Sequence, residues 1–144
     1  MLNLRKNKFH GNIPDELCQL RSVQILDLAE NNLSGPIPKC FVNFSGMGNA
    51  SDWFDAIPPE CSIKYATYRP CLLINIYEDV EWAPVVAKGR ELFYRDTQLV
   101  KILDLSDNNL FGQIPRELTG LVGLISLNLS RNHLSGKIPG DIGE

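Results

Sequence analysis

The sequence is poor in the residues from which catalytic centres, metal sites and nucleic-acid interfaces are built. It has 2 histidines and 4 cysteines among 144 residues. No two cysteines form a C-x-x-C pair, and no constellation of His, Cys or carboxylate groups is evident, so neither zinc binding nor acid–base catalysis is indicated. The formal net charge is −3, with no run of five like charges, so the basic footprint of a nucleic-acid-binding protein is lacking. We expect no enzyme activity, no metal, no cofactor and no nucleic-acid partner.

Long apolar runs are also lacking. The longest apolar stretch, CLLINIY at 71–77, is far shorter than the roughly 20 residues that span a bilayer. The N-terminus, MLNLRKNKFHG, carries charge from Arg5 onward and a repeat motif from Leu2, so it does not resemble a signal peptide. Four cysteines and several Asn-x-Ser sequons are nevertheless typical of secreted proteins. These features predict a piece, or a shortened copy, of a longer protein.

What the sequence does have is a repeat. The pattern L-x-L-x-x-N-x-L-x-G-x-I-P occurs at 2–14, 26–38, 103–115 and 127–139, with Phe9 as its one apolar substitution. Asn7 and Asn31 are 24 residues apart, as are Asn108 and Asn132, which is the periodicity of leucine-rich repeats. Asn31 and Asn108 are 77 residues apart, which exceeds one period by 53, so a segment of that size interrupts the array.

This periodicity predicts an α/β repeat fold, a solenoid with one parallel β-sheet on its concave face and short helical turns on its convex face. In each coil, L-x-L is a strand with inward leucines, and Ile-Pro turns a fixed corner. The recurring Asn lies where the chain leaves the strand, and its side-chain amide can bond backbone groups that the turn leaves unpaired. We expect repeats 1 and 2 over 1–44, a non-repeat island over 45–98, and repeats 3 and 4 over 99–144. The predicted structural ladder comprises Asn7, Asn31, Asn108 and Asn132.

The motif S-G-x-I-P resembles the plant-specific class of leucine-rich repeats. KGRELFY at 88–94, followed by LVKILDLSDNNLFGQIP, is similar to plant leucine-rich-repeat receptor-like proteins, the group that includes fungal-xylanase receptors and Cf-type resistance proteins. The resemblance implies the C-terminal ectodomain of a cell-surface immune or developmental receptor, in which the island helps to bind ligand. It places the chain on the extracellular face of the plasma membrane as part of a longer single-pass receptor, or in the secreted fraction if the chain is complete.

The resemblance also implies partners and binding residues. The ligand would be a protein or peptide, such as a microbial secreted protein, and the second partner a co-receptor kinase of the somatic-embryogenesis type. Two other functions remain open: a secreted leucine-rich-repeat inhibitor of wall-degrading enzymes, and an ectodomain segment of a receptor kinase. We expect the island to contact ligand through Tyr77, Trp82, Lys88, Arg90 and Tyr94. The expected co-receptor surface, pointing outward from repeats 3 and 4, comprises Lys101, Ser106, Ser126, Ser130 and Arg131.

Spacing favours two disulfides. Cys18 and Cys40 fall on the convex sides of adjacent repeats, and Cys61 and Cys71 would close a short loop in the island, although Cys18 could instead be a buried free thiol. The predicted glycosylation sites are the sequons at Asn32, Asn43, Asn49 and Asn128.

If repeat 2 stacks directly on repeat 3, two columns of polar residues align on the concave face. One column is Lys6, Glu30, Asp107 and Arg131, and the other is Asn3, Asp27, Asp104 and Asn128. Like charges directly opposite one another are unfavourable in a sheet. The columns therefore predict an acidic patch at the root of the island, with cations only at the column ends.

Overall fold

A computed structural model describes residues 1–48, 83–87, 90–94 and 100–142. Residues 83–87 and 90–94 are described by their backbone only. The chain divides into two compact units, one formed by Met1–Ala50 with Lys101–Glu144, and the other by Ser51–Val100. The first unit contains all four repeats. In the second, β5 (Ala83–Ala87) and β6 (Arg90–Tyr94) pair as an antiparallel hairpin in which Val85 faces Leu92.

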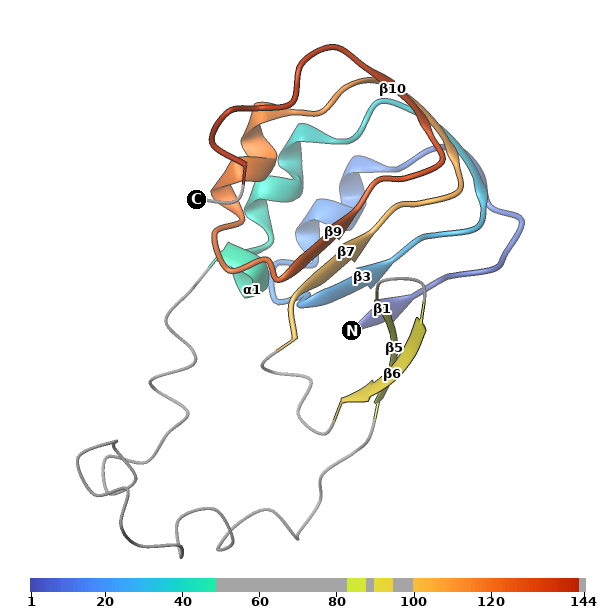
Figure 1. Ribbon diagram of the computed structural model, residues 1–144, viewed down its shortest axis with the longest axis vertical. Coiled ribbons are helices and arrows are strands. Elements are labelled where there is room, and N and C mark those ends of the chain that lie inside the picture. Colours follow the sequence, from blue (N-terminus) through green and yellow to red (C-terminus); the bar gives the residue numbers. More distant parts are fainter. Residues whose placement is uncertain (49–82, 88–89, 95–99, 143–144) are drawn as a thin grey trace, which may run out of the picture. The chain divides into compact units, whose positions relative to one another are not determined.

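The L-x-L segments form the predicted parallel sheet. Its order is β1 (Leu2–Asn3), β3 (Ile25–Asp27), β7 (Ile102–Asp104) and β9 (Ser126–Asn128), as Figure 1 shows. β3 and β7 pair directly, with Leu26 opposite Leu103 and Asp27 opposite Asp104. The stacking of repeat 2 on repeat 3 is therefore confirmed, and the insertion leaves the register of the array intact.

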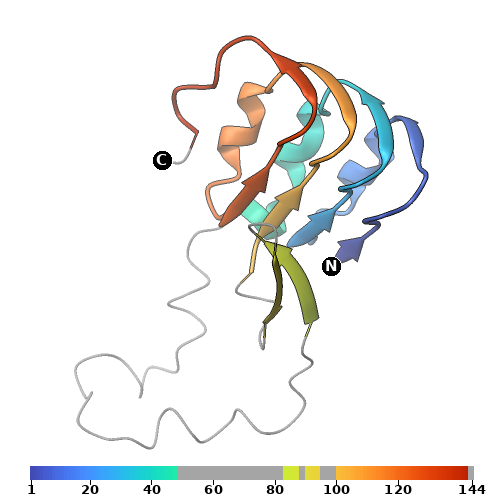
Figure 2. The same ribbon diagram turned by 45° about the vertical axis from the view of Figure 1, so that its right-hand side comes forward.

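Short 3₁₀ helices form the opposite side of the solenoid. They are η1 (Asp15–Gln19), η2 (Lys39–Asn43) and η7 (Arg116–Gly120), and Figure 2 shows them lined up behind the strands. Each begins directly after the proline of an Ile-Pro pair, whose ring fixes φ between −62° and −73° at this corner. The sequence predicted these turns from leucines spaced three apart.

A second parallel sheet, which the sequence analysis did not predict, joins the two sides. It contains β2 (His10–Asn12), β4 (Asn32–Gly35), β8 (Asn109–Gln113) and β10 (His133–Ser135) in the order β10-β8-β4-β2. The glycine of each repeat motif lies in or beside these strands, with φ between 81° and 88°. Glycine adopts this conformation at no steric cost. His10 in β2 and His133 in β10 are exposed strand residues.

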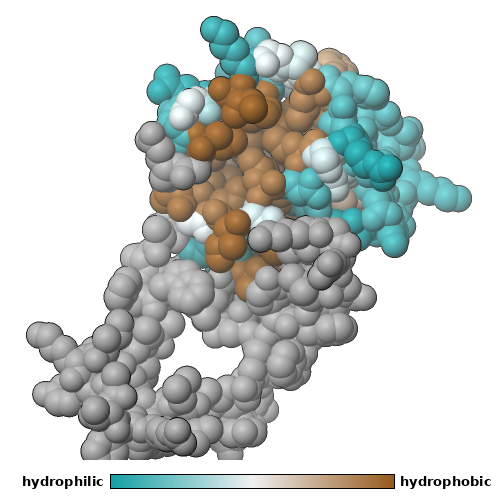
Figure 3. Space-filling view, viewed as in Figure 1, coloured by the Kyte–Doolittle hydropathy of each residue, from teal (hydrophilic) through white to brown (hydrophobic). Residues whose placement is uncertain are grey.

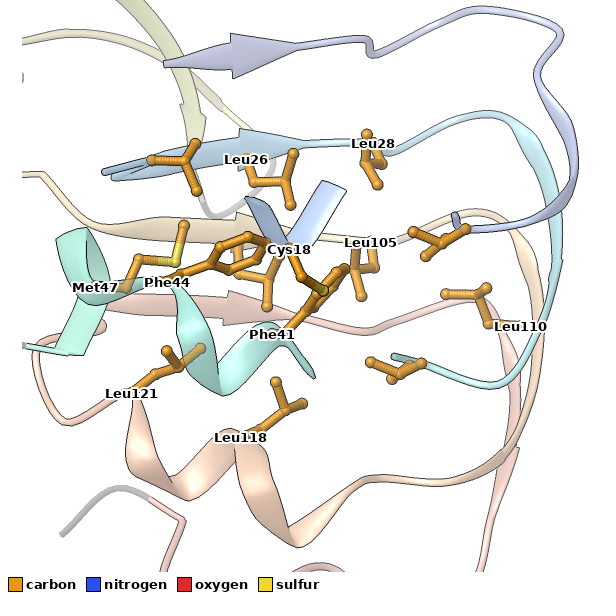
Figure 4. Packing of buried hydrophobic residues seen from close by; sticks show 14 of the residues in the cluster. Cys18, Leu26, Leu28, Phe41, Phe44, Met47, Leu105, Leu110, Leu118 and Leu121 are labelled. Atoms are coloured by element: carbon orange, nitrogen blue, oxygen red, sulfur yellow. The ribbon is translucent and has the colours of Figure 1, made fainter. Parts of the chain in front are cut away.

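The core lies between the first sheet and the 3₁₀ helices (Figure 4). The ring centroids of Phe41 and Phe44 are 4.8 Å apart, and leucines from repeats 2 and 3 pack around them. Each coil is too thin to bury its own leucines, so burial depends on the neighbouring coil. No further coil packs on the outer face of repeat 4 among the described residues. This end face is the brown, hydrophobic area in Figure 3.

Repeat 2 continues past the expected start of the island. α1 (Ser45–Gly48) packs with the repeats, and Met47 is fully buried in their core. Gly46 N–H donates to the Arg21 carbonyl at 2.9 Å, and Gly123 N–H donates to the Met47 carbonyl at 2.9 Å. These bonds continue the inter-repeat ladder, so residues 45–48, which we assigned to the island, belong to the packed coil.

Candidate functional site

The asparagine ladder lies at the exit of each concave strand. The Asn31 side-chain amide donates to the carbonyls of Leu4, Leu28 and Ala29, and its oxygen accepts from Phe9 N–H. Asn108 and Asn132 make the same set of bonds one and two coils further along. Within the described residues, Asn7 bonds to two carbonyls of its own coil, Leu4 and Arg5. These side chains satisfy backbone groups of the solenoid, so their role is structural.

A second ladder shapes the concave surface itself. The side chain of the residue between the two leucines accepts a hydrogen bond from the backbone N–H two positions further along. Asp27 accepts from Ala29, Asp104 from Ser106, and Asn128 from Ser130. These bonds fold the chain into a tight turn. The residues that follow adopt the left-handed conformation, with φ of 55° to 57°, at Lys6, Glu30, Asp107 and Arg131.

Arg5 neutralises the acidic patch that the two columns predicted. Its Nε lies 2.8 Å from Asp27 Oδ2, one terminal nitrogen lies 2.7 Å from Glu30 Oε1, and the other lies 2.6 Å from Asp104 Oδ2. The side chains of Arg5, Asp27 and Asp104 are 13%, 5% and 4% exposed. The expected open acidic patch is therefore wrong, because one guanidinium from repeat 1 reaches across repeats 2 and 3.

Burial of the Asp27 carboxyl raises its pKa above the usual value, even though Arg5 opposes the shift. Between the pKa of the unfolded chain and the higher pKa of the folded chain, the folded chain keeps a proton on Asp27 that the unfolded chain has released. The contribution of Asp27 to stability is present at low pH and is lost as pH rises from about 4 through the folded-state pKa. We expect the free energy of unfolding of the native chain, relative to Asp27→Asn, to fall over this window in a series of urea titrations. A rise would contradict the assignment.

Exposed ion pairs connect the outer column of the concave face. Lys6 Nζ lies 3.9 Å from Glu30, and an Arg131 terminal nitrogen lies 3.3 Å from Asp107 Oδ2. Such exposed pairs contribute little to stability. Arg131 is thus held close to the sheet but remains accessible from solvent, as the co-receptor hypothesis requires.

The structure corrects two residues of the expected co-receptor surface. Lys101 is 4% exposed and Ser106 is 7% exposed, so neither points outward. The Ser106 hydroxyl turns back to donate to Asp104 Oδ1 at 2.6 Å, and Lys101 lies directly before β7, where its carbonyl accepts from Ile125 N–H. Ser126 is half-buried, and Ser130 and Arg131 are exposed. The accessible part of this surface is therefore confined to repeat 4.

Three of the five expected ligand-binding residues of the island lie outside the described part of the chain. Tyr77, Trp82 and Lys88 lie outside the described residues, whereas Arg90 and Tyr94 are the first and last residues of β6. Cys61, Cys71 and the sequon at Asn49 also lie outside. Their roles stay predictions.

Three links join neighbouring repeats on the convex side. The Cys18–Cys40 disulfide connects repeats 1 and 2 across 22 residues. Lys39 pairs with Glu117 at 3.2 Å between repeats 2 and 3, and Arg116 pairs with Asp141 at 3.2 Å between repeats 3 and 4. A groove of about 1340 Å³ runs along these links past the Ile-Pro corners of repeats 2, 3 and 4. Its lining residues come from all four repeats, so no single motif indicates the groove.

Removing the disulfide with the double substitution Cys18→Ala and Cys40→Ala should lower the free energy of unfolding by about 3 kcal/mol. The physical reason is the larger conformational freedom of the unfolded chain when this loop is open. Guanidinium unfolding of oxidised protein measures the loss. The double variant removes this disulfide alone, whereas a reductant could also act on Cys61 and Cys71. Equal guanidinium midpoints for the variant and the native chain would contradict the prediction.

The described sequons differ in accessibility. Asn32 and Asn43 are exposed, and Asn32 also accepts a hydrogen bond from Asn109 at 2.7 Å. Asn128 is half-buried, and its amide donates to Asp104 at 3.3 Å while its oxygen accepts from the Ser130 hydroxyl. A glycan on Asn128 would disturb the second ladder, so Asn32 and Asn43 are the better acceptors.

Comparison with known proteins gives the family. The leucine-rich-repeat family model matches residues 1–20, 22–44, 99–121 and 123–144. Receptor-like protein EIX2 of Solanum lycopersicum is 43% identical over 137 residues, covering 88% of this chain and 12% of that protein. Receptor-like protein 54 of Arabidopsis thaliana is 31% identical, covering 96% of this chain and 17% of that protein. The chain belongs to the plant leucine-rich-repeat receptor-like proteins. It spans less than a fifth of the length of these two relatives.

A solved structure agrees with this assignment. The Arabidopsis receptor kinase HAESA, in complex with the peptide hormone IDA and the co-receptor SERK1, matches with a TM-score of 0.55 and 31% identity, over 96% of this chain and 14% of the HAESA chain. The solenoid is thus shared with a receptor ectodomain. Among the described residues of this receptor-like chain, none of the helices has the length and apolar content to cross a bilayer.

Proposed function

We propose that this chain is a non-catalytic segment of a plant cell-surface receptor ectodomain, which binds a protein or peptide ligand and a co-receptor kinase. The observation that carries the proposal is the extent of the EIX2 match. It covers 88% of the chain, more than the repeats occupy, and so extends into the inserted segment. Similarity confined to the repeats would indicate only a solenoid, whereas shared sequence beyond them indicates a shared binding module.

The two partners would meet different parts of the chain. The island, through Tyr77, Trp82, Lys88, Arg90 and Tyr94, would contact the ligand. Ser126, Ser130 and Arg131 of repeat 4 would contact the co-receptor, because they are the accessible members of the expected surface. Support comes from HAESA, a structural neighbour in complex with both a peptide hormone and SERK1. Each surface would supply part of an interface of about 800 Å² per partner.

The test is association of the full-length receptor with the SERK1 ectodomain in the presence of its ligand. The double substitution Ser130→Arg and Arg131→Glu should reduce association at least about tenfold, because it adds bulk and reverses charge at the contact. The matched control is Lys39→Glu on the convex side. Lys39 is 76% and Arg131 77% exposed, and their ion pairs measure 3.2 and 3.3 Å.

If the control variant and the double variant both bind SERK1 as the native receptor does, repeat 4 is not the co-receptor surface. If an island deletion leaves ligand binding intact, the ligand role of the island is wrong. The two halves of the proposal therefore fail separately.

A further inference from the structure

The tripeptide Asn-Leu-Ser occurs twice in the repeats, at residues 32–34 and 128–130, and each copy is a complete acceptor sequence for an N-linked glycan. Such glycans are attached as the chain enters the secretory pathway, before the coils have stacked. The enzyme that attaches them therefore meets the same three residues in both copies. Any difference in what a glycan does at the two positions must come from the fold.

The two copies lie on different surfaces of the solenoid. Asn32 is the first residue of β4 in the second sheet, where it is exposed and its side-chain oxygen accepts a hydrogen bond from Asn109 at 2.7 Å. Asn128 is the last residue of β9 in the first sheet, and it is half-buried. Only the second copy therefore belongs to the concave face, which also carries the proposed co-receptor contacts.

Asn128 lies in the middle of those contacts. Leu127 and Leu129 pack against the core, so Ser126, Asn128 and Ser130 turn together to the opposite, concave side. Residues two positions apart on an extended chain are about 7 Å apart. Asn128 is therefore flanked on both sides by small side chains of the proposed co-receptor surface.

The direction of the Asn128 side chain is fixed. Its Nδ2 donates to Asp104 Oδ2 at 3.3 Å, and Arg5 holds the same carboxylate oxygen at 2.6 Å. Its Oδ1 accepts from the Ser130 N–H at 3.2 Å and from the Ser130 hydroxyl at 2.8 Å. The amide is thus held between Asp104 and Ser130, and a group attached to Nδ2 stays on the concave face.

We propose that a glycan on Asn128 closes the co-receptor surface, so that glycosylation at this position and co-receptor binding exclude one another. The inference rests on the proposed function. In the modification, Nδ2 loses one hydrogen as a proton and forms a bond to C1 of the first sugar. The bond from C1 to the pyrophosphate of a lipid-linked oligosaccharide donor breaks.

The modified chain can still fold. The glycan weakens the bond to Asp104, but Oδ1 remains free to accept from Ser130, so the turn after β9 can form. What changes is access to the surface. An N-linked glycan is bulky and solvated, whereas Ser126 and Ser130 are small side chains that a partner must approach closely.

The test compares molecules of one receptor preparation. Full-length receptor from plant cells is passed over immobilised SERK1 ectodomain, under the conditions of the association test above, and glycopeptide mass spectrometry measures occupancy of each sequon in the bound and unbound fractions. Occupancy of Asn128 should be at least about tenfold lower in the bound fraction, because a bulky glycan prevents close contact. The matched control is Asn32, the same tripeptide on the second sheet, whose occupancy should be equal in both fractions.

Equal occupancy of Asn128 in the two fractions overturns the inference, as does the absence of a glycan on Asn128 from the whole preparation. Resistance to thermolysin separates a covered surface from a misfolded chain. An unbound fraction that is more sensitive to the protease than the bound one would also overturn the inference, because the glycan would then act through the fold. If no receptor binds SERK1, whatever its glycans, the proposed co-receptor role itself fails.

Discussion

Replacing Arg5 with methionine is expected to lower the free energy of unfolding by about 4 kcal/mol, because the carboxylates of Asp27 and Asp104 are left buried without their cation. Both accept hydrogen bonds shorter than 3 Å from Arg5, and they lie opposite each other on neighbouring strands. Water cannot replace the guanidinium at side chains exposed by only a few per cent. Denaturant unfolding at pH 7 measures the loss.

The control for this substitution is Lys6→Met. Lys6 is adjacent in sequence and also pairs with Glu30, but at 3.9 Å and in solvent, so its loss should cost less than about 0.5 kcal/mol. The Arg5→Met defect should shrink as pH is lowered, because burial raises the pKa of the Asp27 carboxyl and the substitution removes the cation that opposes this shift. Equal stability of the two variants would show that Arg5 does not hold repeats 1, 2 and 3 together.

The Arg5 bridge shows what a repeat pattern cannot predict. At the position of Arg5 the other motifs have Ala29, Ser106 and Ser130, so no column of the alignment marks it. The Arg5 side chain extends beyond repeat 1 to Asp27 and Asp104. Its distance from them depends on how repeats 2 and 3 stack on repeat 1. The aligned columns gave Asp27 and Asp104 correctly as neighbours, but the charge that compensates them comes from outside the columns.

The second sheet shows a different limit. Its strands are three to five residues long and contain or directly precede the glycine, so they carry no alternating run that would indicate a strand. Neighbouring strands are also displaced by two positions, which pairs Phe111 with His133 and His10 with Asn32. Aligning equivalent positions therefore names the wrong neighbours on this face. The first sheet, which pairs equivalent positions, was predictable.

The ladder of asparagines was predictable for the same reason. One residue type recurs at one position, and its short amide can serve only groups close to the strand exit. The expectation that Ser106 faces outward was wrong because a hydroxyl two residues after Asp104 is within reach of that carboxylate. Alternation alone does not reveal a side chain that turns back toward its own strand.

Replacing Asn108 with leucine is expected to lower the free energy of unfolding by about 4 kcal/mol, because four hydrogen bonds are lost. The buried Leu33 N–H loses its acceptor, and the Leu28, Leu105 and Ser106 carbonyls each lose one of two donors. The Asn108 amide donates to the Leu28, Leu105 and Ser106 carbonyls at 3.0 to 3.2 Å, and its oxygen accepts from Leu33 N–H at 3.0 Å. Leucine has a similar volume but can make none of these bonds. Denaturant unfolding gives the loss, and hydrogen exchange at Leu33 should show the lost protection directly.

Two further substitutions decide why Asn108 matters. Asn7→Leu removes an exposed amide with two bonds within its own coil, and water can replace it, so its cost should stay below about 1 kcal/mol. Asn132→Leu removes the same set of bonds, but to partners 22 and 27 residues away, whereas Asn108 bonds to partners 75 and 80 residues away. If unpaired groups alone set the loss, Asn132→Leu should approach Asn108→Leu after allowance for its lower burial. If Asn108 also closes the array across the insertion, only Asn108→Leu should let repeats 3 and 4 exchange amide hydrogens faster than repeats 1 and 2, because only that junction depends on residues separated by the whole inserted segment.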